Sequence, residues 1–179
     1  MTNILFVCTA NQFRSPIAAS YFAHRLKETG EPGEWQVFSA GTWTVNGLPA
    51  HPKAVTAAAQ LGLNLNKHKT REVTAKMLSD ADLIIVMEQG QKEALECEFT
   101  DCIGRIVLMG ELAGEHESEI LDPARTDFED GDAIVRSIVA CIDKGFVKLL
   151  DLTRPHSGTQ CIQSVSDPVE KDARLAGLC

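Results

Sequence analysis

A cysteine and an arginine separated by five residues lie near the start of the chain, and a serine and a proline follow directly. A thiolate at Cys8 can attack an electrophile, and the guanidinium fork of Arg14 can bind two oxygens of a phosphate-sized anion. Unpaired backbone N–H groups in the loop between them would cradle the same anion. The spacing therefore predicts a nucleophile and an oxyanion cradle within one short loop.

The elements on either side of this loop follow from the apolar pattern. The run 4–7 is short, continuous and apolar, as expected of a buried parallel strand. Ser15 is a good N-cap and Pro16 fits the first position of a helix, which apolar residues at helical spacing extend to residue 29. Cys8 is thus expected where a strand ends and a helix dipole favours a thiolate. An inert cysteine buried at a strand end is the alternative.

Strand-like and helix-like patterns alternate along the rest of the chain. We expect strands at 36–39, 83–87 and 105–109, and helices at 51–61, 71–78, 88–96 and 134–150, the last preceded by a capping box of Thr126 and Glu129. This order predicts an α/β fold with a parallel sheet covered by helices on both faces. Ligands of such sheets bind beyond the carboxyl ends of the strands, where Cys8 lies.

The length, charge and cysteine spacing of the chain argue against several classes of protein. With 179 residues the chain is expected to form one domain, and its formal net charge of −8 argues against nucleic acid as a partner. No apolar run reaches the ~20 residues of a membrane span and no secretory segment is visible, so we expect a cytoplasmic protein without membrane insertion. The six cysteines form no Cys-x-x-Cys pair, so neither a disulfide scaffold nor a metal site is predicted, and no cofactor is expected.

Four motifs carry a resemblance to a known family. They are the Cys-x5-Arg-Ser-Pro stretch and, downstream, residues 39–42 (Ser-Ala-Gly-Thr), 81–87 (Ala-Asp-Leu-Ile-Ile-Val-Met) and 122–123 (Asp-Pro). In order and spacing these resemble the low-molecular-weight protein-tyrosine phosphatase family. The resemblance implies a three-layer sandwich with a four-stranded parallel sheet in the order 2-1-3-4, built from residues 1–151, and leaves a polar C-terminal extension at 152–179. It also implies metal-independent hydrolysis of a phosphorylated protein substrate by a monomer or weak dimer.

The resemblance further implies roles for individual residues. Cys8 would form a cysteinyl-phosphate intermediate, Arg14 would bind the phosphoryl oxygens, and Asp122 would protonate the leaving group. Pro123 would stiffen the loop that carries this general acid. The phosphate-binding residues would be Thr9, Ala10, Asn11, Gln12, Phe13, Arg14 and Ser15.

Residues around this loop would support it. Asn11 is expected in a left-handed backbone conformation, which asparagine tolerates, and the family ties it to the residues matching Ser15 and Ser39. Ser15 would also hydrogen-bond the cysteine sulfur and ease its departure when the intermediate is hydrolysed. Trp43 either lines the rim as an aromatic wall or packs as an ordinary loop residue.

The loop departs from the family pattern at three positions. Ala10 stands where the family has a glycine, which is tolerable only if its φ is negative. Phe13 stands in place of a second cysteine that can trap the oxidised nucleophile as a disulfide, so this protective route is absent. Gln12 stands where an aliphatic residue lies against the substrate ring, which puts strict phosphotyrosine preference in doubt.

Other functions compete with protein-tyrosine phosphatase activity. A thiol-dependent arsenate reductase has the same fold and would need a relay of cysteines, for which Cys97 and Cys102 are the candidates. A phosphoarginine phosphatase would differ only in the shape of its pocket. A non-catalytic phosphate-binding module would not need both a nucleophile and a general acid, and a Cys–His hydrolase built on His51 or His68 would not need Arg14.

Overall fold

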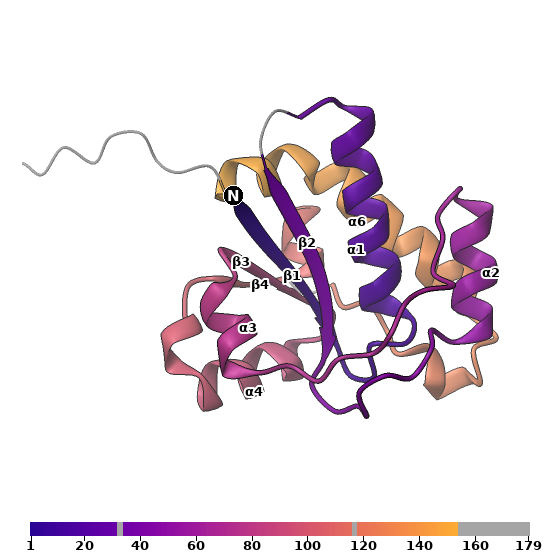
Figure 1. Ribbon diagram of the computed structural model, residues 1–179, viewed down its shortest axis with the longest axis horizontal. Helices are drawn as coiled ribbons and strands as arrows, with labels where there is room; N and C mark the ends of the chain where they lie inside the picture. Colours follow the sequence, from indigo (N-terminus) through magenta and orange to yellow (C-terminus); the bar gives the residue numbers. More distant parts are fainter. Residues whose placement is uncertain (32–33, 116–117, 154–179) are drawn as a thin grey trace, which may run out of the picture.

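The computed structural model describes residues 1–31, 34–115 and 118–153, and within these ranges four parallel strands form a single sheet. The strands are β1 (Thr2–Cys8), β2 (Trp35–Gly41), β3 (Leu83–Val86) and β4 (Ile106–Leu108), in the order β2-β1-β3-β4 (Figure 1). The predicted fold class and strand order are confirmed. β1 is central because its apolar run is buried on both faces, and it pairs with β2 and β3.

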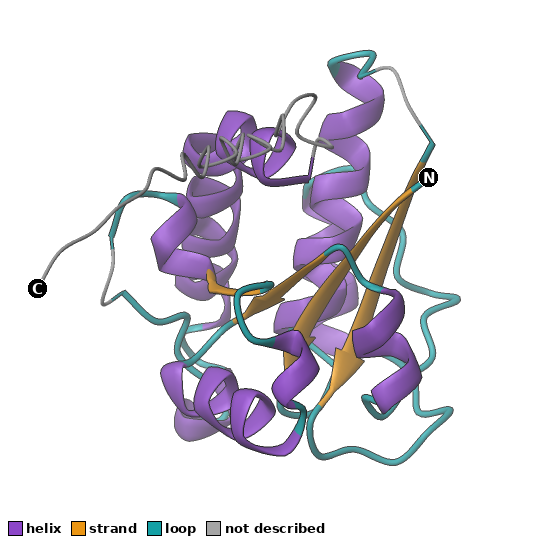
Figure 2. Ribbon diagram, turned by 90° about the vertical axis from the view of Figure 1, so that its left-hand side faces the viewer, coloured by secondary structure: helices purple, strands orange, loops and turns teal. Residues whose placement is uncertain are grey.

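Helices cover both faces of the sheet, which gives the three predicted layers (Figure 1). The helices are α1 (Arg14–Glu28), α2 (Pro52–Gln60), α3 (Ala75–Asp80), α4 (Gln89–Glu98), α5 (Met109–Leu112) and α6 (Gly131–Thr153), with 3-10 segments η1 (Thr100–Cys102) and η2 (Pro123–Thr126). Ile4 and Phe6 of β1 pack with α1, α2 and α6, whereas Leu5 and Val7 pack with α3 and α4. Because successive strand side chains point to opposite faces, one apolar run contributes to both cores. Figure 2 shows the helices on either side of the strands.

The helix expected at residues 71–78 starts later than predicted. α3 begins after Thr74, whose Oγ1 accepts a hydrogen bond from the Met77 N–H at 3.3 Å. The residues before it run extended beside the end of β2. There the Gly41 N–H donates to the Arg71 carbonyl and the Val73 N–H donates to the Gly41 carbonyl, both at 2.8 Å. Pairing with a neighbouring strand has outweighed the local helical pattern.

The predicted capping box of Thr126 and Glu129 is wrong. Thr126 ends η2, and Asp127 and Phe128 follow with left-handed φ values of 46° and 63° before α6 begins. The Phe128 ring stacks on the ring of His51, with centroids 3.8 Å apart and planes 7° apart. This contact between distant parts of the chain favours a turn at the position where the local pattern predicted a helix start.

α6 ends at Thr153. The predicted polar extension, 152–179, lies outside the described residues from 154 onward, and its separation from the domain stays a prediction. No helix in the described ranges is long and apolar enough to cross a membrane. Within the same part of the chain, no cluster of three or more His, Cys, Asp or Glu side chains could hold a metal ion.

Candidate active site

The predicted anion loop, residues 9–13, connects the carboxyl end of β1 to α1. Cys8 is the last residue of β1, is 2% exposed, and has its Sγ 3.1 Å from Oγ of Ser15. The prediction that Ser15 is the N-cap is wrong, because α1 already begins at Arg14 and Phe13 occupies the cap position. Because Ser15 lies inside the first turn of α1, its hydroxyl faces the sulfur of Cys8 and does not cap the N–H groups of the helix. Ser15 is therefore placed to stabilise a thiolate.

Asn11 maintains the curvature of this loop. It is fully buried and has the predicted left-handed backbone, with φ of 53°. Its Nδ2 donates to Oγ of Ser15 and to Oγ of Ser39, both at 2.9 Å, and its Oδ1 accepts from the Arg71 N–H at 2.9 Å. The carbonyl oxygen of Asn11 lies 2.8 Å from Nε2 of His68. The ties to Ser15 and Ser39 that the resemblance implied are both present.

The anion loop lies against the end of β2 so closely that only a glycine fits at Gly41. A Cβ atom built there would lie 2.6 Å from the carbonyl oxygen of Thr9. Just beyond, the Thr42 N–H donates to the Cys8 carbonyl at 2.9 Å and the Trp43 N–H donates to the Thr9 carbonyl at 3.0 Å. The Trp43 side chain is 81% exposed, so it flanks the loop without the packing of an ordinary loop residue.

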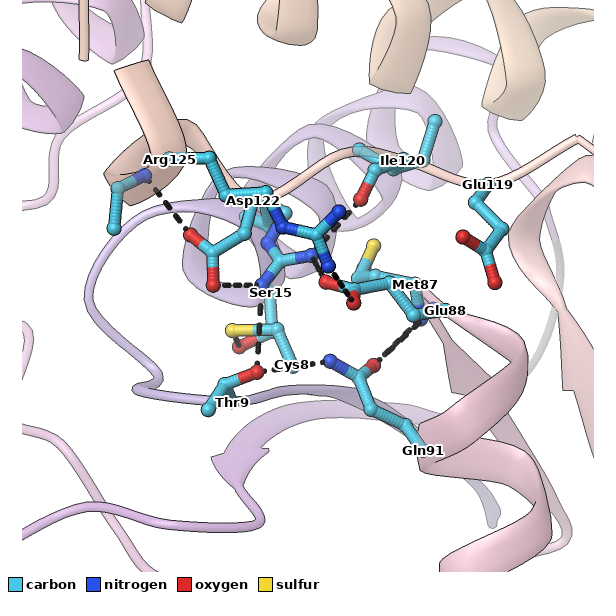
Figure 3. A network of polar contacts seen from close by, with 12 residues as sticks. Cys8, Thr9, Ser15, Met87, Glu88, Gln91, Glu119, Ile120, Asp122 and Arg125 are labelled. Carbon is cyan, nitrogen blue, oxygen red and sulfur yellow. Dashed lines mark hydrogen bonds and ion pairs between the residues drawn. The ribbon is translucent and has the colours of Figure 1, made fainter. Parts of the chain in front are cut away.

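Arg14 is 2% exposed, and hydrogen-bond acceptors surround its guanidinium group. Three of the residues that supply them, Glu88, Ile120 and Asp122, are labelled in Figure 3. Nη1 donates to Oε1 of Glu88 and, at 2.9 Å, to the Ile120 carbonyl. Nη2 donates to Oδ2 of Asp122 at 2.7 Å and to Oγ1 of Thr9 at 3.5 Å. Two carboxylates from distant parts of the chain therefore compensate the buried charge. A bound phosphate would compete with Asp122 for Nη2.

Asp122 lies on a loop that is pinned to the sheet. The Ile120 N–H donates to the Met87 carbonyl at 2.9 Å, just after β3. Asp122 itself is extended, with φ of −75° and ψ of 117°, as expected before Pro123. Its Oδ1 accepts from the Ala124 N–H at 3.0 Å, which leaves Oδ2 for the arginine. The loop thus delivers the candidate general acid to the anion site.

Two residues at the start of α4 belong to the site although no sequence motif predicted them. Glu88 contacts Arg14 through one carboxylate oxygen, and its other oxygen lies 3.4 Å from Nη2 of Arg125. Gln91 is buried and donates to the hydroxyl of Thr9 at 3.1 Å. A signal was available, because Glu88 follows the apolar run of β3 almost directly and so lies at the ligand-binding edge of the sheet.

The three loop residues that depart from the family pattern, Ala10, Gln12 and Phe13, differ in their backbone conformation and contacts. In the described part of the chain Ala10 is not among the residues with positive φ, so alanine replaces glycine there without strain. Gln12 donates through Nε2 to the Pro49 carbonyl at 3.2 Å, which directs its amide toward the segment after β2. Phe13 is buried, with its ring centroid 5.6 Å from that of Phe128.

The two histidines considered for a Cys–His hydrolase, His51 and His68, both have structural partners. His51 caps α2, its Nδ1 accepting from the Lys53 N–H at 3.3 Å, and burial followed by the Lys53 charge lowers its pKa. Burial is also the largest cause that lowers the pKa of His68, against an opposing effect of the hydrogen bond to Asn11, while Arg71 lowers it further. These contacts give no support to a Cys–His hydrolase.

Comparison with known proteins agrees with this geometry. Residues 3–161 match the family model described as low molecular weight phosphotyrosine protein phosphatase. The chain belongs to this family. Family membership makes the protein a hydrolase of phosphoric monoesters and confirms the resemblance noted from the motifs.

Several relatives of this phosphatase are bacterial. It is 33% identical over 145 residues to the probable low molecular weight protein-tyrosine-phosphatase EpsP of Ralstonia nicotianae, covering 79% of this chain and 94% of the relative. It is 36% identical over 133 residues to Wzb of Escherichia coli K12, covering 74% and 84%. The crystal structure of the tyrosine phosphatase Wzb from Escherichia coli K30 in complex with sulphate matches with a TM-score of 0.72 at 27% identity, covering 82% and 97%. A mutant of YwlE from Bacillus subtilis, at 24% identity and a TM-score of 0.76 over 84% and 99%, shares the fold.

Proposed function

We propose that this phosphatase hydrolyses phosphotyrosine in proteins through a cysteinyl-phosphate intermediate on Cys8. The observation that carries the proposal is the meeting of three groups at the carboxyl edge of the sheet. Cys8 and Arg14 bound one tight loop, and the Asp122 carboxylate lies 2.7 Å from the guanidinium group of Arg14. A nucleophile, a phosphate-binding fork and a proton donor are the parts that this chemistry needs.

The first step transfers the phosphoryl group to sulfur. The phosphate ester binds to Arg14 and the backbone N–H groups of the loop, and displaces Asp122 from Nη2. The Cys8 thiolate attacks phosphorus, and the bond from phosphorus to the tyrosine oxygen breaks. The Asp122 carboxylate, once displaced from Nη2, takes up a proton from solvent and donates it to that oxygen, so tyrosine leaves as a neutral phenol.

The second step hydrolyses the intermediate. The Asp122 carboxylate takes a proton from water while the water oxygen attacks phosphorus, and the bond from sulfur to phosphorus breaks. Inorganic phosphate leaves, Asp122 is protonated again, and the Cys8 thiolate is restored. The Ser15 hydroxyl, 3.1 Å from the sulfur, stabilises the thiolate as it departs.

Phosphotyrosine is the favoured substrate because EpsP and Wzb are named protein-tyrosine-phosphatases. The neighbours named as YwlE arginine phosphatase are 24% identical to this chain and support its fold only. An arsenate reductase relay gains no support from the packing, since Cys102 lies in the core with Leu5 and Val7 whereas Cys8 lies in the core on the other face.

The test is turnover of p-nitrophenyl phosphate without added metal, followed by trapping of the phosphorylated enzyme. The parent protein and Cys97→Ser, which changes an exposed cysteine, should be equally active, and Cys8→Ser should be inactive. Undiminished activity of Cys8→Ser would overturn the mechanism. Phosphotyrosine and phosphoarginine peptides, compared by kcat/KM, then decide the substrate, and arsenate turnover by the parent would favour the reductase instead.

A further inference from the structure

A buried amide supports the first residue of the anion loop. Gln91, in the first turn of α4, is 7% exposed, and its Oε1 accepts hydrogen bonds from the N–H groups of Met87 at 3.0 Å and Glu88 at 3.3 Å. Backbone N–H groups can only donate, so these two bonds determine which end of the amide carries the oxygen. Nε2 must point the other way, and it donates to Oγ1 of Thr9 at 3.1 Å.

The hydroxyl of Thr9 therefore receives two hydrogen bonds. One comes from Gln91 and the other from Nη2 of Arg14, 3.5 Å away, and a guanidinium group has no acceptor. A hydroxyl oxygen has two lone pairs and one hydrogen, so with both lone pairs in use it can only donate. Among the residues that the structure describes, none accepts a hydrogen bond from this hydroxyl. Its hydrogen is available to a ligand.

The ligand in reach is the phosphoryl group. Thr9 directly follows Cys8, and Figure 3 shows its hydroxyl beside Cys8, with the Gln91 amide on its other side. We propose that Oγ1 of Thr9 donates a hydrogen bond to a phosphoryl oxygen of the bound ester, and that Gln91 is the positioning residue that aims it. This inference rests on the proposed function, because it takes the phosphoryl group to lie between Cys8 and Arg14.

The arrangement adds a side-chain donor to a cradle otherwise made of backbone N–H groups and one arginine. Hydrogen bonds to an ionised acceptor are roughly twice as strong as neutral ones. When phosphate displaces the Asp122 carboxylate from Arg14, the hydroxyl keeps its bond from Gln91 and so keeps its direction. The Thr9 hydroxyl then binds a phosphoryl oxygen of the bound ester, of the cysteinyl-phosphate intermediate and of inorganic phosphate alike.

Binding of inorganic phosphate, measured by calorimetry, tests the hydroxyl without any turnover. Thr9→Val removes the hydroxyl at almost constant shape and should weaken phosphate binding by about tenfold or more, as expected for the loss of a hydrogen bond to a charged group. Thr9→Ser retains the hydroxyl and should restore binding to nearly the parent value. If Thr9→Val does not fold, Thr9→Ala serves in its place. Phosphate binding by the valine or alanine variant as tight as in the parent would overturn the proposal.

The role of Gln91 is tested by a double-mutant cycle. Gln91→Met keeps the volume of the side chain and removes both its donors and its acceptor. It should weaken phosphate binding in the parent and add little in the Thr9→Val background, because the two residues act through one hydrogen bond. A loss of equal size in both backgrounds would mean that Gln91 acts only through the stability of α4. Thermal unfolding of each variant, recorded beside the binding data, identifies such a general loss.

The outcome is separable from that of the proposed function. Phosphate affinity does not depend on which atom attacks phosphorus, so full activity of Cys8→Ser would refute the nucleophile and leave the binding result intact. Conversely, an inactive Cys8→Ser together with unchanged phosphate affinity in Thr9→Val would retain the phosphatase mechanism and refute the hydroxyl donor.

Discussion

The Asp122 carboxylate lies 2.7 Å from Nη2 of Arg14, although 108 positions separate the two residues along the chain. The proposed general acid thus occupies the guanidinium nitrogen that a phosphoryl oxygen would take. Binding of substrate must replace a carboxylate by a phosphate on the same cation. The displaced Asp122 then remains beside the ester, where its proton is needed.

Asp122→Asn should therefore have two opposite effects. It should lower kcat for p-nitrophenyl phosphate by about 10²-fold or more, because the general acid is lost. It should also bind inorganic phosphate several-fold more tightly, since a neutral amide competes less well for Arg14. Asp127→Asn is the matched control, because Asp127 is exposed and has a left-handed φ that asparagine tolerates. Phosphate affinity in Asp122→Asn no better than in the parent would contradict the exchange.

Glu88 has one oxygen on a buried cation and one on an exposed cation, so its two ion pairs should differ in strength. Glu88→Ala deprives the buried Arg14 of an ion-pair partner and should lower the free energy of unfolding by about 1–3 kcal/mol. Arg125→Ala removes only the pair at 3.4 Å, in which the Arg125 side chain is 65% exposed, and should cost less than about 1 kcal/mol. Urea denaturation measures both. Equal losses of stability in the two variants would contradict the expectation that the ion pair with the buried Arg14 is the stronger one.

Gly41 is expected to tolerate no side chain. Gly41→Ala would place a methyl group 2.6 Å from the Thr9 carbonyl and push the anion loop away from β2, with a loss of activity and of about 1–3 kcal/mol in stability. Gly90→Ala is the control, because its added Cβ meets nothing within 4 Å and alanine favours the helix by roughly 0.5–1 kcal/mol. Thermal unfolding and kcat together test this. An active, stable Gly41→Ala would disprove the close approach.

His68 should make the folded protein sensitive to acid. Burial lowers the pKa of His68 below its ordinary value of 6.5, so the unfolded chain binds a proton more readily than the folded one. The resulting stability is fully present above pH 6.5 and is lost as the pH falls through that value toward the lower folded pKa. His68→Gln should reduce the dependence of the unfolding free energy on pH in this range. An unchanged pH dependence of the unfolding free energy in His68→Gln would contradict this expectation.

Oxidation should inactivate this phosphatase in a way that thiols reverse poorly. Phe13 packs against Phe128 at the position where a second cysteine would trap the oxidised nucleophile. Sulfenic acid on Cys8 then has no neighbour in the loop to form a disulfide and proceeds toward irreversible forms. The measurement is activity after prolonged peroxide treatment and subsequent incubation with thiol. Rapid and complete recovery would refute the prediction.

Local patterns were reliable where neighbouring residues alone decide the structure. The apolar run before Cys8 became the central strand, and asparagine took the left-handed position in the loop, because burial and backbone sterics act over a few residues. The patterns failed at Ser15 and Thr126. There a local capping preference competed with contacts to the Cys8 sulfur and with the packing of Phe128 on His51, and these contacts prevailed.

The sequence by itself determined the loop of the proposed reaction centre, since Cys8 and Arg14 lie at the two ends of a segment that joins a strand to a helix. Only the tertiary structure decided what surrounds the guanidinium group. Asp122 lies 108 positions from Arg14 and Glu88 lies 74, and Gln91 reaches Thr9 across 82. The crossover connections of a parallel sheet bring the ends of its strands to one edge regardless of their separation in the chain. Periodicity and spacing carry no measure of such distances, and therefore the partners of the arginine were found only in the folded molecule.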